Sequence, residues 1–230
     1  MEYTSDPRIV PKARKLQKVE YEETLEMTSL GAKVLQTRSV EMATKYKVPI
    51  QVRSTFSDEP GTMLADEEEV MERRLITGVT YNHNEAQITL IKVKNSPGIA
   101  AAVFGPLAEA EINVDMIVQT VSENGKETEM TFTIGKNDLK GAVSKLKKIK
   151  DKIGYKSLIT DENVVKVSVV GVGMRSHAGL AQKMFHTLAD VGANILVIST
   201  SEIKISVLIG REHMERAIKA LHTAYGLDEK

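Results

Sequence analysis

A short motif occurs twice in this chain, 81 residues apart. In each copy a glycine, Gly98 or Gly179, is followed fifteen residues later by an asparagine, Asn113 or Asn194. An alternating, strand-like stretch precedes each copy, and an internal repeat of this kind constrains the fold more than any other feature of a sequence. The repeat predicts two copies of a small β/α module, each with a loop-to-helix junction suited to a small polar ligand.

The composition excludes several classes of function. The 230 residues include 31 basic and 31 acidic side chains, so the formal net charge is zero, which argues against nucleic acid or an anionic membrane as a partner. The absence of cysteine excludes disulfides and thiolate metal sites, and the five histidines lie at no metal-ligand spacing. No apolar run approaches the roughly 20 residues of a membrane span, and the start does not resemble a signal peptide. We therefore expect a cytoplasmic protein without a metal site.

The first module is assigned to residues 83–161. Its pattern predicts strands at 76–82, 86–94, 112–121, 127–135 and 155–161 and helices at 97–110 and 137–151. Apart from the surplus strand at 76–82, this is the β-α-β-β-α-β order of a ferredoxin-like fold.

The second module lacks a final strand. Strands are predicted at 164–171, 193–201 and 203–210 and helices at 178–191 and 211–225, after which the chain ends. A three-stranded remnant would leave a sheet edge bare, and the surplus strand, at about 75–80, can fill that place. The expected fold class is therefore α+β, with two ferredoxin-like βαββαβ modules, the first inserted into the second, which takes residues 75–82 plus 162–230.

Residues 1–63 read as an α/β fragment of a larger domain, and residues 64–74 as a linker. The fragment's pattern predicts helices at 19–30 and 34–47, a strand at 50–54 and a turn at 57–61.

The loop before the first repeated helix has the chemistry to bind an amino acid. The free N–H groups at a helix N-terminus, here around Gly98 and Ile99, suit a carboxylate. The next strand is expected to bring Asn113 and Asp115 to the same end of the sheet, where their oxygens can bind an ammonium group. The alternative is that Ser96 only caps the helix and Asn113 only makes a turn; the repeat favours ligand binding.

Two enzymatic interpretations fail on spacing. Ser176, His177 and Asp190 lack a Gly-x-Ser-x-Gly elbow, so no catalytic residue is assigned. Gly171-x-Gly173 followed by Gly179 does not match the dinucleotide fingerprint.

Several segments together resemble one known family. Residues 109–119 and 198–207 are similar to the paired ACT domains at the C-terminus of aspartate kinases, and 169–177 is similar to the linker between those domains. Residues 3–8, 31–35 and 54–62 resemble the end of the same family's kinase domain. The resemblance covers essentially the whole chain.

The resemblance implies roles for particular residues. Tyr3, Asp6, Arg8 and Lys33 would contact the nucleotide. The implied effector-binding residues are Asn95, Pro97, Gly98, Ile99, Ala100, Asn113, Val114, Asp115, Gln119, Asn194, Ile195, Thr200, Ser201 and Glu202. The complete kinase uses ATP and Mg, and no cofactor is expected in this chain. It lacks the family's phosphate loop and aspartate-binding segment, so we expect it to be inactive in aspartate phosphorylation by itself.

The same resemblance implies a homodimer through the ACT modules, an amino-acid effector, and in some members a separate catalytic kinase chain. The family usually has aspartate where Asn95 stands, proline where Ala178 stands and an acidic residue where Leu196 stands. Losing two negative charges disfavours lysine, so threonine is the foremost expected effector and lysine the second. The second module is expected to serve mainly as an interface. A stand-alone ACT amino-acid sensor acting on another partner is the alternative function. Whether Met1 is the natural start, how many effectors bind and whether a catalytic chain completes the protein in trans stay open.

Overall fold

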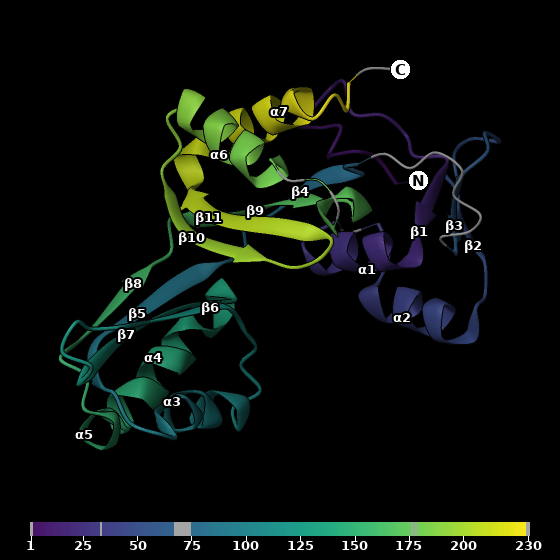
Figure 1. Cartoon of the computed structure of the whole chain (residues 1–230). Helices are drawn as coiled ribbons and strands as arrows, with labels where there is room; N and C mark the ends of the chain where they lie inside the picture. The colour runs from purple at the N-terminus through teal and green to yellow at the C-terminus, as the bar shows by residue number, and fades with distance from the viewer. Residues whose placement is uncertain (1, 33, 67–74, 176, 178, 229–230) are drawn as a thin grey trace. The chain divides into compact units, whose positions relative to one another are not determined.

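The computed structural model describes residues 2–32, 34–66, 75–175, 177 and 179–228. The chain divides into two compact units, residues 83–165 on one side and residues 1–82 with 166–230 on the other (Figure 1). The first module thus forms a unit by itself, whereas the second module shares its unit with the segment that precedes both modules. We call residues 2–66 of the described chain the leading segment.

The first module has the predicted ferredoxin-like order. Its elements are β5 (Ala86–Lys94), α3 (Ile99–Ala108), β6 (Val114–Val121), β7 (Glu127–Ile134), a 3₁₀ turn at Lys136–Asp138, α4 (Leu139–Lys148), α5 (Lys150–Ile153) and β8 (Ser157–Asp161). The strands lie in the order β6-β7-β5-β8, with every neighbouring pair antiparallel. The alternating apolar residues of β5 and β7 form one core with the apolar faces of α3 and α4. Phe132 of β7 is fully buried there and meets Phe104 of α3 edge to face, with ring centroids 5.1 Å apart.

The second module repeats this sheet with one strand taken from elsewhere in the chain. Its elements are β4 (Gly78–Asn82), β9 (Val164–Val170), a 3₁₀ turn at Val172–Arg175, α6 (Leu180–Asp190), β10 (Ile195–Thr200), β11 (Lys204–Gly210), a 3₁₀ turn at Arg211–His213 and α7 (Met214–Ala224). The order is β10-β11-β9-β4, and β4 runs antiparallel to β9 with Gly78 opposite Val170. β4 therefore occupies the place that β8 occupies in the first module. The predicted insertion of the first module into the second is confirmed.

The leading segment contains more sheet than the sequence predicted. It consists of β1 (Lys18–Glu20), α1 (Tyr21–Ser29), α2 (Thr37–Tyr46), β2 (Ile50–Val52) and β3 (Thr62–Ala65), with β3 between β1 and β2. β1 and β3 were not predicted: β1 overlaps the start of the helix predicted at 19–30, and β3 crosses the expected boundary between the fragment and the linker. Leu64 is fully buried in β3, so residues 64 and 65 of the expected linker belong to the sheet. Residues 67–74 of that linker lie outside the described residues.

Candidate functional site

The loop before α3 ends in a glycine with a left-handed backbone. Gly98, the N-cap of α3, has a φ of +85°, which a glycine adopts without strain. The helix begins at Ile99, so Pro97 lies in the preceding turn and not, as predicted, in the first helical turn. The Ile99 N–H donates to the Ser96 carbonyl at 3.1 Å, so this amide, which was expected to hold a carboxylate, is already occupied. Ala100 follows in the same first turn.

Asn95 fixes this loop to the turn between β6 and β7. Its side-chain amide donates to the Gly125 carbonyl at 2.9 Å, and its backbone N–H donates to the Lys126 carbonyl at 2.9 Å. Asn95 therefore already has a structural partner in addition to its proposed contact with an effector.

The expectation that Asn113 and Asp115 lie at the same end of the sheet as the α3 loop is wrong within one chain. Asp115 pairs with Thr133, which pairs with Gln87 near the start of β5, whereas the loop follows Lys94 at the other end of β5. Because β5 and β6 run parallel, with β7 antiparallel between them, β6 begins where β5 begins. Six residues of strand separate Asp115 from the level of the loop, roughly 20 Å at 3.3 Å per residue.

The start of β6 is irregular and exposed. The register of β6 against β7 shifts between Asp115 and Val118, and Met116 has a φ of +42°. The Asp115 carboxylate accepts the Met116 N–H at 2.8 Å. Asn113, Asp115 and Gln119 are exposed and Val114 is half-buried. Gln119 is opposite Met130, closer to the level of the α3 loop than Asp115 is.

In the second module, too, the predicted effector residues lie at opposite ends of the sheet. Gly179 is the N-cap of α6 with a φ of +98°, matching Gly98. Thr200, Ser201 and Glu202 end β10 and form its turn into β11, next to the end of β9, because the Gly171 N–H donates to the Ile203 carbonyl at 2.8 Å. Asn194 and Ile195 lie at the opposite end, at the start of β10. The structure therefore places residues 200–202 beside the end of β9 and residues 194 and 195 at the opposite end of the sheet.

The predicted nucleotide loop, residues 3–8, contains an ion pair of its own. Arg8 donates to both carboxylate oxygens of Asp6, at 3.0 and 2.8 Å. This pairing with Arg8, more than its other contacts, lowers the pKa of Asp6 to about 2. Tyr3 bridges to Lys15 through the backbone. Lys33, the fourth predicted nucleotide residue, lies outside the described residues.

Sequence reasoning missed three buried or half-buried residues that join the leading segment to the second module and to the strand before it. Tyr81 of β4 donates its hydroxyl to Asp6 at 3.0 Å, and the ring of His222 in α7 meets the Thr4 hydroxyl at 2.8 Å. Glu23 of α1 accepts hydrogen bonds from the Thr77 hydroxyl and the Val172 N–H. No local pattern signals such contacts, since the partners lie 75, 218, 54 and 149 residues apart.

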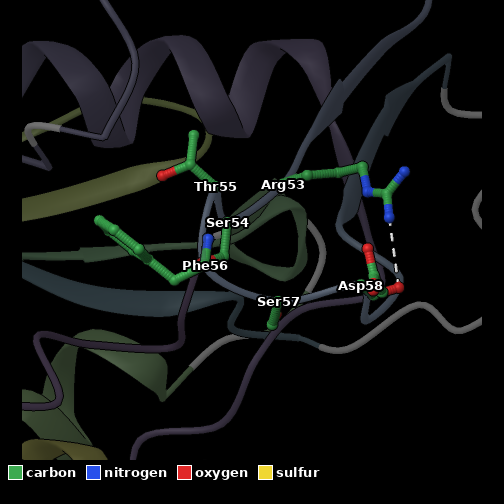
Figure 2. A pocket seen from close by; sticks show the side chains of 6 residues that line it. All are labelled: Arg53, Ser54, Thr55, Phe56, Ser57 and Asp58. Atoms are coloured by element: carbon green, nitrogen blue, oxygen red, sulfur yellow. Dashed lines mark hydrogen bonds between the residues drawn. The ribbon is translucent and has the colours of Figure 1, made fainter.

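A shallow hollow of about 530 Å³ lies on the loop after β2, and none of the residues that line it is a predicted effector residue (Figure 2). Its lining is Arg53, Ser54, Thr55, Phe56, Ser57 and Asp58. Arg53 donates to the Asp58 carbonyl at 3.2 Å, and the Phe56 ring is 96% exposed.

The described residues contain no helix long and apolar enough to cross a membrane. They also contain no group of three or more His, Cys, Asp or Glu side chains placed to hold a metal ion.

Comparison with known proteins matches three segments of the chain to known domain families. Residues 87–151 and 167–225 each match a model of the ACT domain, and residues 3–54 match the amino acid kinase family. The aspartokinase of Pseudomonas aeruginosa is 50% identical over 228 residues, which are 98% of this chain and 55% of that protein. The regulatory subunit of aspartate kinase from Thermus thermophilus is 43% identical with a TM-score of 0.62, over 65% of this chain and 98% of that one.

The chain belongs to the aspartokinase family. A third similar protein is E. coli aspartokinase III, whose structure in complex with lysine and aspartate is 25% identical with a TM-score of 0.76, over 96% of this chain and 49% of that one. This aspartokinase chain spans about half the length of the curated relatives that it matches. The two ACT domains are the two modules described above, and the leading segment supplies the amino acid kinase match.

Proposed function

We propose that this chain is the regulatory part of an aspartate kinase, joined to the last part of its kinase domain, and that it binds an amino acid for feedback inhibition. The support is the combination of two ACT domains with a partial kinase domain in one chain. The complete kinase would transfer the terminal phosphoryl group of ATP, with Mg, to the side-chain carboxylate of aspartate. This chain would contribute the nucleotide loop, with Asp6 and Arg8 already paired.

The single observation that carries the regulatory site is the separation of its two halves. The α3 loop and Asp115 lie at opposite ends of one sheet, so one chain alone cannot clamp a single amino acid between them. β6 is an edge strand with three exposed apolar side chains, Ile117, Val118 and Val121. If β6 pairs antiparallel with β6 of a second copy, the beginning of one strand meets the end of the other. Asp115 of the second copy then lies beside the α3 loop.

The proposed effector site therefore lies between two copies of the first module. The N-terminus of α3, around Gly98 and Ala100, binds the carboxylate of the amino acid. Asp115 of the second copy binds its ammonium group by charge-assisted hydrogen bonds. Asn95 supplies no negative charge for a second ammonium, so threonine fits better than lysine. The lysine in the E. coli aspartokinase III structure shows that a family member binds a free amino acid.

The function can be tested by completing the kinase. The part of P. aeruginosa aspartokinase outside the matched region would be fused to this chain, and formation of phosphoaspartate from ATP and aspartate would be measured. We expect turnover that threonine inhibits at lower concentration than lysine does. The same kinase portion can be supplied as a separate chain.

Two results would contradict the proposal. A folded fusion without aspartate-dependent turnover would remove the kinase assignment. Turnover that neither amino acid alters, in a chain that still binds threonine by calorimetry, would favour a stand-alone sensor acting on another partner.

A further inference from the structure

The nucleotide loop is held mainly by the second ACT module. The Thr4 carbonyl accepts the Val79 N–H of β4 at 2.8 Å, and its hydroxyl meets the Nε2 atom of His222 in α7 at 2.8 Å. β4 approaches so closely that a Cβ on Gly78 would lie 2.9 Å from the Thr4 carbonyl oxygen. Tyr81 of the same strand holds Asp6. Both ends of β4 thus contact the loop.

A second group of contacts joins the end of the loop to the end of α7. Arg14 donates its Nε–H to the Leu227 carbonyl at 2.8 Å, and its backbone N–H donates to the Thr4 hydroxyl at 2.9 Å. Lys12 lies 3.8 Å from the carboxylate of Asp228. Residues 12 and 14 therefore contact the segment that follows α7.

His222 is the buried centre of this contact. Its side chain is fully buried, and its Nδ1 atom has no hydrogen-bond partner among the described residues. An unsatisfied nitrogen in a buried ring is unfavourable. The other ring nitrogen, Nε2, makes the hydrogen bond with Thr4. Burial lowers the pKa of His222; nearby Arg14 lowers it further and Asp228 opposes the change. Burial therefore favours the neutral form of the ring.

The same end of α7 also reaches the α6 loop. Tyr225, three residues after His222, donates its hydroxyl to the Leu180 carbonyl at 2.7 Å. Leu180 is the first residue of α6, directly after the N-cap Gly179. Two hydrogen bonds thus join the end of α7 to other segments, one from Tyr225 to Leu180 at the start of α6 and one between His222 and Thr4.

We propose that His222 is a positioning residue through which the second ACT module sets the conformation of the nucleotide loop, with Tyr225 linking His222 to the start of α6. The role of the loop in nucleotide binding rests on the proposed function. The physical connection from Leu180 through Tyr225 and His222 to Thr4 does not. A movement of the α6 start, whether caused by a ligand or by a partner chain, shifts α7 and with it the loop.

Hydrogen exchange followed by mass spectrometry on the full chain tests the connection. The amides of Thr4, Ile9 and Val10 are hydrogen-bonded within the loop and report on its order. His222→Phe keeps a planar ring and removes both nitrogens, whereas His222→Gln keeps a donor at a similar reach. We expect loop exchange to become roughly fivefold faster in His222→Phe, about 1 kcal/mol at 25 °C, and to stay near the parent rate in His222→Gln. Tyr225→Phe should accelerate it about twofold.

Two controls separate positioning from general destabilisation. His186→Gln changes an exposed histidine on α6 and should leave loop exchange unchanged. Residues 83–165, which form the other unit, should exchange equally in all variants. Unchanged loop exchange in His222→Phe, or equal acceleration in the Phe and Gln variants, would overturn the positioning role. Parent-like exchange in Tyr225→Phe would overturn the link to α6.

The fusion with the P. aeruginosa kinase part tests the functional consequence. His222→Phe should raise the KM for ATP several-fold and leave the KM for aspartate unchanged, with recovery in His222→Gln. An equal rise in both KM values would contradict the proposal. If the fusion is inactive, the kinase assignment fails, while the exchange experiment still decides whether His222 positions the loop.

Discussion

The two ACT modules of this chain share a topology but differ in what surrounds them. Both have a four-stranded sheet and a helix whose N-cap is a glycine in the left-handed region, Gly98 or Gly179. The first module forms a unit by itself, with its own final strand. The second takes its edge strand from residues before the first module, and its helix α7 contacts the leading segment. The difference suggests that one repeat is specialised for binding and the other for transmission.

If the first module is energetically separate, a cavity in its core should destabilise it alone. Phe132→Ala removes a fully buried ring and should lower the stability of residues 83–165 by about 3–5 kcal/mol. The corresponding position of the second module is Val207, also fully buried, and Val207→Ala should lower the stability of the other unit by a smaller amount. Hydrogen exchange resolved by peptide distinguishes the two. Equal loss in both units from either variant would show that they unfold together.

Threonine binding should depend on the first module more than on the second. Asp115→Ala should weaken threonine binding about tenfold or more, because a charge-assisted hydrogen bond is worth on the order of 1.5–3 kcal/mol. Leu196→Ala, at the equivalent position of the second module, should change it far less. Calorimetric titration measures both, with sedimentation showing that the oligomeric state is unchanged. Equal losses, or tighter binding of lysine than of threonine by the parent chain, would place the ligand elsewhere.

The attachment of the second module to the leading segment depends on Glu23. Glu23→Ala leaves the Thr77 hydroxyl and the Val172 N–H without their acceptor and should lower stability by about 1–3 kcal/mol. Glu23→Gln keeps the accepting oxygen and should stay near the parent at low pH. Urea denaturation of each variant gives the free energy of unfolding.

The pH dependence of the Gln variant has a definite sign. Burial, the largest effect, raises the pKa of Glu23 above its ordinary 4.5, so the folded protein binds this proton more tightly than the unfolded chain does. The stability that comes from the protonated form is complete below 4.5 and is lost as the pH rises through the raised value. Glu23→Gln should therefore gain stability relative to the parent over that range. A relative loss with rising pH would mean that the carboxylate is stabilised when charged.

Much of the fold followed from local patterns, whereas the assembly of the sites did not. The insertion could be predicted because a surplus strand before the first module matched a missing strand after Tyr225. The position of Asp115 was mispredicted, although the parallel direction of β5 and β6 in a ferredoxin-like sheet places the start of β6 away from the α3 loop. β1 was missed because it overlaps the start of the helix predicted at 19–30, and β3 because it crosses the expected boundary of the linker. The contact of Thr4 with His222 joins residues 218 apart, and nothing in either local sequence encodes it.

The smallest expected effect concerns a residue pair that the repeat itself provides. After α3 the chain turns at Glu111 with a φ of +56°, and after α6 it turns at Gly192 with a φ of +71°. Equivalent hydrogen bonds close both turns, from Ile112 to Leu107 and from Ala193 to Leu188, each 3.0 or 2.9 Å long. These are the left-handed helix ends at which glycine is preferred. The first module therefore holds a side chain where the second avoids one.

Exchanging the residue types should move stability in opposite directions. Glu111→Gly removes left-handed strain of about 1–2 kcal/mol from the folded state. The glycine also raises the entropy of the unfolded chain, which lowers stability by about 0.4–1 kcal/mol. We expect a net gain in stability of about 0.5–1 kcal/mol. Gly192→Ala should lose about 1 kcal/mol through its φ alone, because a Cβ there would meet no atom of the described residues within 4 Å. Urea denaturation with peptide-resolved exchange assigns each change to its unit. A loss on Glu111→Gly would mean that this side chain makes a contact worth more than its strain, and that the first module keeps it for binding or pairing.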